Sequence, residues 1–135
     1  MRTHHYGWTL IELVVVVAVL AILVMIAYPV YTEQIIKSRR PDGMALLYNA
    51  AQREQQFYTV NNSFTATAGS GGLDISATSS DGYYTLSIVA DSTTYTLTAT
   101  RAGLQTADTR CGDLTLTHLG AKGNSGGSLP ASKCW

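Results

Sequence analysis

The chain divides into three stretches that differ in how hydrophobic and polar positions alternate. From Leu13 to Tyr28 no side chain is charged or strongly polar. Counted from Trp8 to Tyr31, the apolar stretch has about the 20 residues that a helix needs to cross a bilayer. The pattern therefore predicts a membrane-depth helix over residues 8–31.

The second stretch continues as an amphipathic helix to about Tyr58. Apolar residues recur at spacings of three and four, which predicts an apolar stripe on the helix. The stripe comprises either Ile36, Leu47, Ala50 and Phe57 or Met44, Leu47, Ala51 and Tyr58. Pro29 and Pro41 each lack a backbone donor, so we expect each to bend or locally break the helix. Pro41-Asp42-Gly43 is also typical of a turn, which makes it the weaker point.

The third stretch has a period of two, which is typical of half-buried strands. Residues 59–82 are rich in Asn, Ser, Thr and Gly and predict a surface loop. Apolar and polar residues then alternate over 83–90, 93–101 and 113–118, and Asp91-Ser92 fits a hairpin connection. A sheet with one apolar face needs a cover, which the helical stripe can supply. We expect an α+β fold in which one long helix packs on an antiparallel sheet.

Composition narrows the class of protein. The chain has 135 residues, which favours one domain, and only 13% of them are charged. Its formal net charge is zero, which gives no overall attraction to nucleic acid. The two cysteines, Cys111 and Cys134, lie outside any obvious metal-binding spacing. They fit one disulfide in an oxidising compartment, or two free thiols.

Glu12 is the exception in the apolar stretch. A charge at membrane depth costs at least roughly 2.5–3.5 kcal/mol, so it normally has a partner. Thr9-Leu10-Ile11-Glu12 fits the capping box S/T-x-x-E, with Thr9 as the N-cap, and the negative charge also suits a helix N-terminus. Capping alone does not require the carboxylate to adjoin a long Leu/Val/Ala/Ile run.

The residues from Gly7 to Glu12 resemble the prepilin processing motif of type IV pilins and pseudopilins. The resemblance implies cleavage by a prepilin peptidase between Gly7 and Trp8 and N-methylation of Trp8. It also implies that Glu12 pairs with the N-terminal ammonium of a neighbouring subunit during assembly. The family usually has Phe where this chain has Trp8.

The C-terminal half is also similar to this family. Cys111-Gly112-Asp113-Leu114-Thr115-Leu116, then Gly120-Ala121-Lys122-Gly123 and Cys134-Trp135, resemble the corresponding region of PilE-type minor pilins. The resemblance implies the pilin fold, with a C-terminal loop bounded by a Cys111–Cys134 disulfide. It divides the chain into a leader peptide (1–7), a transmembrane and filament-core half of the helix (8–31) and a periplasmic globular domain (32–135).

The charges that flank the apolar stretch conflict with this topology. Arg2 precedes the stretch, whereas Lys37, Arg39 and Arg40 follow it, and a positive-inside count favours the opposite orientation. The resemblance and the cysteines place the C-terminal part outside the cytoplasm, and we follow them. The cluster after the stretch is typical of a solvated helix face or a lipid-headgroup contact. No aromatic residues are interleaved with it, so no specific nucleic acid is predicted.

Catalytic and metal sites are not predicted. Gly123-Asn124-Ser125-Gly126-Gly127 superficially resembles the surroundings of a protease serine, but His118 is the only histidine in the globular part and a triad needs a rigid scaffold. His4 and His5 have no Cys or His partner nearby. We therefore expect a protein that is not an enzyme and needs no cofactor.

The resemblance implies a structural subunit of a type IV pilus, most like a minor pilin that acts in pilus assembly or priming. Adhesion, twitching motility or DNA uptake would follow from the filament. Its partners would be other pilin subunits, the prepilin peptidase, the inner-membrane assembly platform and membrane lipid. It would lie in the bacterial inner membrane before assembly and in the extracellular filament afterwards. The alternatives are a pseudopilin of a type II secretion system and a single-pass membrane-anchored periplasmic binding domain, for which Glu12 is only a cap.

Overall fold

The computed structural model describes residues 7–135. The expected leader, with Arg2, His4 and His5, therefore falls almost entirely outside the described residues. The chain forms two compact units, one that ends at Ile35 and one that comprises Ile36–Trp135. The second unit carries the sheet and the hydrophobic core.

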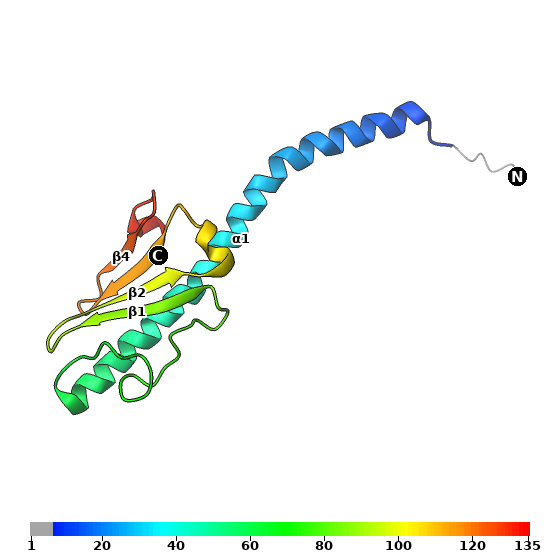
Figure 1. The fold of residues 1–135 in the computed structure, drawn as a ribbon. Coiled ribbons are helices and arrows are strands. Elements are labelled where there is room, and N and C mark those ends of the chain that lie inside the picture. Colours follow the sequence, from blue (N-terminus) through cyan, green and yellow to red (C-terminus); the bar gives the residue numbers. More distant parts are fainter. Residues whose placement is uncertain (1–6) are drawn as a thin grey trace, which may run out of the picture. The chain divides into compact units, whose positions relative to one another are not determined.

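One long helix, α1, spans Leu10–Asn61 (Figure 1). It begins and ends close to the expected bounds of Thr9 and Tyr58. The local break expected at Pro41-Asp42-Gly43 does not occur, because residues 41–43 are helical. A bend at Pro29 or Pro41 stays a prediction.

Asp42 and Gly43, expected in a turn, instead connect α1 to other parts of the compact unit. A Cβ on Gly43 would lie 2.8 Å from Cδ2 of the buried Tyr84 ring, so this glycine is present for close approach to the sheet. The Asp42 carboxylate accepts hydrogen bonds from the backbone N–H groups of Asp81 (3.2 Å) and Tyr83 (3.4 Å). The segment therefore joins the helix to the start of the sheet.

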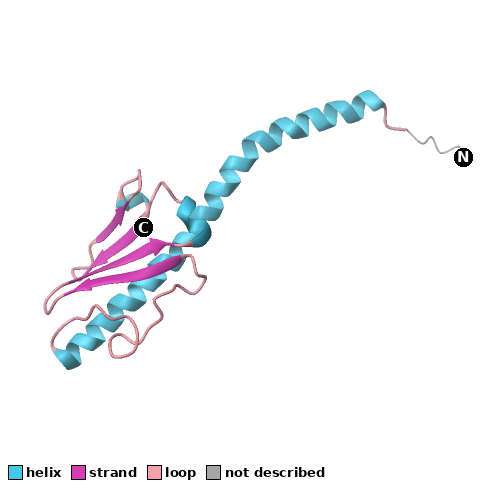
Figure 2. Ribbon diagram, viewed as in Figure 1, coloured by secondary structure: helices cyan, strands magenta, loops and turns pink. Residues whose placement is uncertain are grey.

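The sheet has four antiparallel strands in sequence order, β1 Tyr84–Ala90, β2 Tyr95–Arg101, β3 Asp113–Thr117 and β4 Lys122–Ser125 (Figure 2). The first three confirm the predicted strands within two residues at each end. The fourth, and the 3₁₀ helices η1 (Gly103–Ala107) and η2 (Ala131–Lys133), were not expected. The predicted α+β class, with one helix on an antiparallel sheet, is confirmed.

Strand register explains the core. Leu86 pairs with Ala99, and Ala99 pairs with Leu114, so this row of apolar side chains crosses three strands on one face. Buried residues of α1 meet that face, and the core comprises Leu46, Leu47, Ala50, Leu73, Tyr84, Tyr95, Leu97, Ala99, Cys111, Leu114, Leu116 and Cys134. The alternate positions of the strands carry mainly threonine and serine. The period of two seen in the sequence thus separates core from solvent.

The predicted surface loop lies between α1 and β1, and a buried residue of α1, Glu54, is hydrogen-bonded to it. The Glu54 side chain is fully buried, and one of its carboxylate oxygens accepts a 3.2 Å hydrogen bond from the backbone N–H of Thr65. Its other oxygen, Oε1, has no hydrogen-bond partner. Burial raises the pKa of Glu54, and the Thr65 bond opposes this only in part.

Candidate functional site

The N-terminal half of α1 is capped as the sequence predicts. The backbone N–H of Glu12 donates a 3.3 Å hydrogen bond to Oγ1 of Thr9, which immediately precedes the helix. This geometry confirms Thr9 as the N-cap. It accounts for the backbone of Glu12 but assigns no partner to its carboxylate, so the assembly role of Glu12 stays a prediction.

The apolar residues of this half face outward. Trp8 is 73% exposed, and the large apolar side chains from Leu10 to Val24 are between 42% and 83% exposed. Within the described residues, α1 is the one helix long and apolar enough to cross a membrane, with a mean hydropathy of 3.2 over its best 18-residue window. Such a surface requires lipid or neighbouring helices to cover it. Gly7 and Trp8 precede the helix and belong to no regular element.

At the other end of the chain, Cys111 and Cys134 form a disulfide with a Cα–Cα distance of 5.5 Å. Both residues are buried in the core. The expected disulfide-bounded loop is thus confirmed. We refer to residues 110–135 as the disulfide region.

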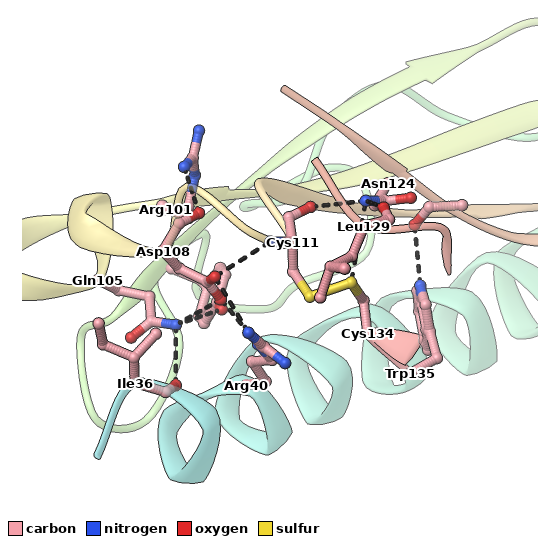
Figure 3. The surroundings of a disulfide bond; sticks show 12 residues. Ile36, Arg40, Arg101, Gln105, Asp108, Cys111, Asn124, Leu129, Cys134 and Trp135 are labelled. Atoms are coloured by element: carbon pink, nitrogen blue, oxygen red, sulfur yellow. Dashed lines mark hydrogen bonds and ion pairs between the residues drawn. A yellow bond between two sulfur atoms is a disulfide. The ribbon is translucent and has the colours of Figure 1, made fainter. Parts of the chain in front are cut away.

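Asp108 joins α1 to the beginning of the disulfide region (Figure 3). Its carboxylate accepts hydrogen bonds from Nε (2.7 Å) and Nη2 (3.1 Å) of Arg40 and from the backbone N–H of Cys111 (3.1 Å). Burial alone would raise the pKa of Asp108, but the hydrogen bonds and charge of Arg40 hold that pKa below its usual range. Arg40, expected in a solvated cluster with Lys37 and Arg39, is instead buried in an ion pair.

Gln105 reinforces the same junction. Its Nε2 donates to the carbonyl of Ile36 (3.2 Å) and to the hydroxyl of Tyr84 (3.0 Å). Burial raises the pKa of Tyr84 to about 12, although the hydrogen bond from Gln105 lowers it. The start of the compact helix segment, η1 and β1 are therefore tied together by buried polar contacts.

The side chain of Asn124, in β4, holds the disulfide region internally (Figure 3). Its Nδ2 donates to the carbonyl oxygens of Cys111 (2.8 Å) and Leu129 (2.9 Å). The indole Nε1 of Trp135 donates to the carbonyl of Gly123, the residue before Asn124 (2.8 Å). β4 is thus tied to both sides of the loop that the disulfide closes.

A lysine and two aromatic rings meet beside β4. The ammonium of Lys122 lies 5.6 Å from the ring centroid of Tyr48 and 5.2 Å from that of Trp135. The two rings contact each other edge to face, with centroids 5.9 Å apart. Lys122 itself is exposed, so an ammonium held by two rings is presented to solvent.

Charge is segregated along the compact unit. Residues 59–100 contain Asp74, Asp81 and Asp91 and neither lysine nor arginine. Residues 101–135 contain two aspartates, and both are paired with arginine, Asp108 with Arg40 and Asp113 with Arg101. The disulfide region also has three exposed basic side chains, Arg110, Lys122 and Lys133, which we call the basic set.

Sequence reasoning missed the basic set because it sought aromatic residues beside the cations in the chain. Tyr48 and Lys122 are far apart in sequence and meet only through packing. A local signal was nevertheless present, since no acidic residue follows Asp113. Counting charge by segment, rather than over the whole chain, would have located a positive region.

Comparison with known proteins gives two family matches. Residues 29–115, more than half of the chain, match the family described as type IV minor pilin ComP, DNA uptake sequence receptor. Residues 2–28 match the prokaryotic N-terminal methylation motif. No curated protein sequence matches the chain.

A solved structure described as a type IV pilin from Shewanella oneidensis is similar to this chain. The two are 27% identical, with a TM-score of 0.52. The match covers 74% of this chain and 97% of the other. The similarity therefore extends over a length comparable to the compact C-terminal unit.

Proposed function

Since this chain belongs to the type IV minor pilin family described as ComP, DNA uptake sequence receptor, we propose that it binds DNA through its disulfide region. The family and the fold make the chain a minor pilin subunit of a type IV pilus, and they are structural rather than enzymatic. The sequence interpretation named DNA uptake among the downstream roles but predicted no specific nucleic acid. The family description leads us to propose instead that the chain does bind DNA.

The observation that carries the proposal is the exposed Lys122 ammonium, held against the rings of Tyr48 and Trp135. Phosphate contacts from Lys and Arg supply most of the sequence-independent affinity for DNA. The basic set provides three such side chains, and the two aspartates of residues 101–135 are both paired with arginine. The acidic segment 59–100 would repel DNA, so the duplex would approach from the disulfide region.

The N-terminal half would supply the filament connection. The methylation motif and the exposed apolar helix fit membrane anchoring and assembly with other pilins. In our proposal the prepilin peptidase cuts between Gly7 and Trp8, Trp8 is methylated, and the C-terminal unit faces the periplasm. The assembly platform then moves the subunit from the inner membrane into the extracellular filament, where Glu12 meets a neighbour's N-terminal ammonium. The match to a pilin family favours this reading over a secretion pseudopilin.

Binding of DNA is tested with the full chain in detergent micelles and a fluorescent duplex. Lys122→Ala should weaken binding about threefold to tenfold at low salt and lower the slope of log K against log[salt] by about 1. Arg53→Ala removes one exposed cation from α1 and is the matched control, so it should leave both quantities unchanged. Equal losses in the two variants, or no binding by the unmodified chain, would refute the proposal.

Processing and assembly are tested in cells that have an active prepilin peptidase. The mass of the native protein should correspond to a chain that starts at methylated Trp8 and contains one disulfide. Glu12→Ala should still insert into the membrane but should be depleted from sheared filaments, because the ammonium of its neighbour loses its partner. A chain that starts at Met1 would reduce Glu12 to a cap, and undiminished incorporation of the variant would contradict the pairing.

A further inference from the structure

The basic set comes from three separate segments of the disulfide region. Arg110 directly precedes Cys111, Lys122 begins β4, and Lys133 ends η2. A DNA backbone presents phosphates at fixed spacing, so it gains from all three cations only if these segments keep fixed relative positions. The fold must therefore contain contacts that fix the positions of these three segments relative to one another.

The disulfide joins only two of the segments. It links Cys111, beside Arg110, to Cys134, beside Lys133. The segment that carries Lys122 pairs with β3 through Leu116 but is outside this covalent link. Its backbone is tied to the Arg110 segment through the ladder with β3, and the N–H of Leu129 donates to the carbonyl of Arg110 (2.8 Å). Side chains add the contacts that reach both other segments at once.

Asn124 makes that connection through one atom. Its Nδ2 donates to the carbonyl of Cys111 on one side and to that of Leu129 on the other, as Figure 3 shows. A primary amide carries two N–H donors on one nitrogen, which a hydroxyl or a carboxylate cannot offer. The same nitrogen lies 3.9 Å from Sγ of Cys134. One side chain therefore touches all three segments.

We propose that Asn124 is the positioning residue of the DNA-binding surface, a proposal that rests on the function proposed above. Its amide fixes Lys122 relative to Arg110 and Lys133, and it makes no contact with DNA itself. Trp135 supports the arrangement, because its Nε1 anchors the carbonyl of Gly123, next to Asn124. Loss of the amide leaves the β3–β4 ladder and the disulfide in place but removes the direct contacts of the Lys122 segment with Cys111 and Leu129, so the spacing of the three cations is less well fixed.

The variant Asn124→Ser, studied as the full chain in detergent micelles, tests whether Asn124 positions the basic set or only stabilises the fold. The variant keeps its formal charge, so any electrostatic change in DNA binding comes from the arrangement of the basic set. We expect affinity for a short duplex to fall at least about threefold and the salt slope to fall by about 1, equivalent to one lost phosphate contact. Asn49→Ser, the same substitution on the exposed face of α1, should match the unmodified chain.

The salt slope distinguishes the alternatives. A purely structural role would lower thermal stability or the fraction of active protein while the active molecules kept the original slope, and that result would overturn the proposal. Should the serine variant lose its disulfide or its native circular dichroism spectrum, Trp135→Phe is tested instead, since it removes the Nε1 donor to Gly123 and keeps an aromatic ring beside Lys122. A phenylalanine variant with an unchanged slope would then overturn the proposal. If the unmodified chain binds DNA with a slope that depends on Lys122 but not on Asn124, the proposed function stands and this inference fails.

Discussion

Removal of either partner of the Arg40–Asp108 ion pair should destabilise the compact unit severely. The side chains of Arg40 and Asp108 are 6% and 1% exposed, and two hydrogen bonds join them. Breaking a buried pair by removing one partner costs about 3–5 kcal/mol, because the other charge is left buried without compensation. A domain of this size has a free energy of unfolding of about 5–15 kcal/mol, so one substitution removes a large fraction of it.

The structure also predicts how the two substitutions combine. Asp108→Asn leaves the guanidinium buried, and Arg40→Met leaves the carboxylate buried, so each single variant should lose about 3 kcal/mol or more. The double variant contains neither charge and should lose less than the sum of the single losses. The carboxylate also accepts the backbone N–H of Cys111, which asparagine can partly replace, so Arg40→Met should be the more harmful single change.

Urea unfolding of residues 32–135 measures these free energies. Trp135 is the only tryptophan in that fragment, and its indole bonds to Gly123 within the disulfide region, so its fluorescence reports the relevant part of the fold. Because the folded pKa of Asp108 is lowered, its stabilising contribution should be complete above its ordinary pKa of 3.8 and should disappear as pH falls through the folded value. Single variants that lose less than about 1 kcal/mol each, with additive effects in the double variant, would refute this reasoning.

Two further predictions concern α1. Gly43→Ala should cost about 1–3 kcal/mol in urea unfolding, because its Cβ would overlap the buried ring of Tyr84, whereas Gly69→Ala, in open space, should change stability by less than about 0.5 kcal/mol. Glu54→Gln should be more stable than the unmodified protein near neutral pH, since burial raises the pKa of this carboxyl. The contribution of Glu54 is complete below its ordinary pKa of 4.5 and is lost as pH rises through the raised value, so the two stability profiles should converge at low pH. Equal costs for the two alanine variants, or parallel pH profiles for the Glu54 pair, would contradict these expectations.

The sequence predicted the elements that have a strong hydrophobic period. The stripe of α1 and the alternation of the first three strands are local patterns, and each determines which side of its element is buried. β4 has no such pattern, because Lys-Gly-Asn-Ser contains no apolar residue. It is a strand because β3 offers it an edge and because the side chain of Asn124 bonds to chain on both sides of the loop.

Predictions from neighbouring residues were wrong where contacts between distant parts of the chain determine the structure. Pro-Asp-Gly is a good turn sequence, yet here the glycine leaves room for the Tyr84 ring and the aspartate accepts hydrogen bonds from backbone just before β1. Arg40 appeared to belong to a surface cluster, because its partner Asp108 is 68 residues away in the chain. The candidate site was not predicted for the same reason: Tyr48 in α1 and Lys122 in β4 are far apart in the chain and meet only in the folded structure.

The continuity of α1 gives the compact unit a defined path for mechanical load. One helix contains both the exposed apolar segment and the stripe that covers the sheet, so tension applied to its N-terminal part reaches the compact unit through Ile36 and Arg40. The Ile36–Gln105 and Arg40–Asp108 contacts therefore lie near the start of the compact unit, where they resist extraction of the helix from the sheet. A subunit that is pulled out of a membrane by its helix would keep its globular part folded for as long as these contacts withstand shear.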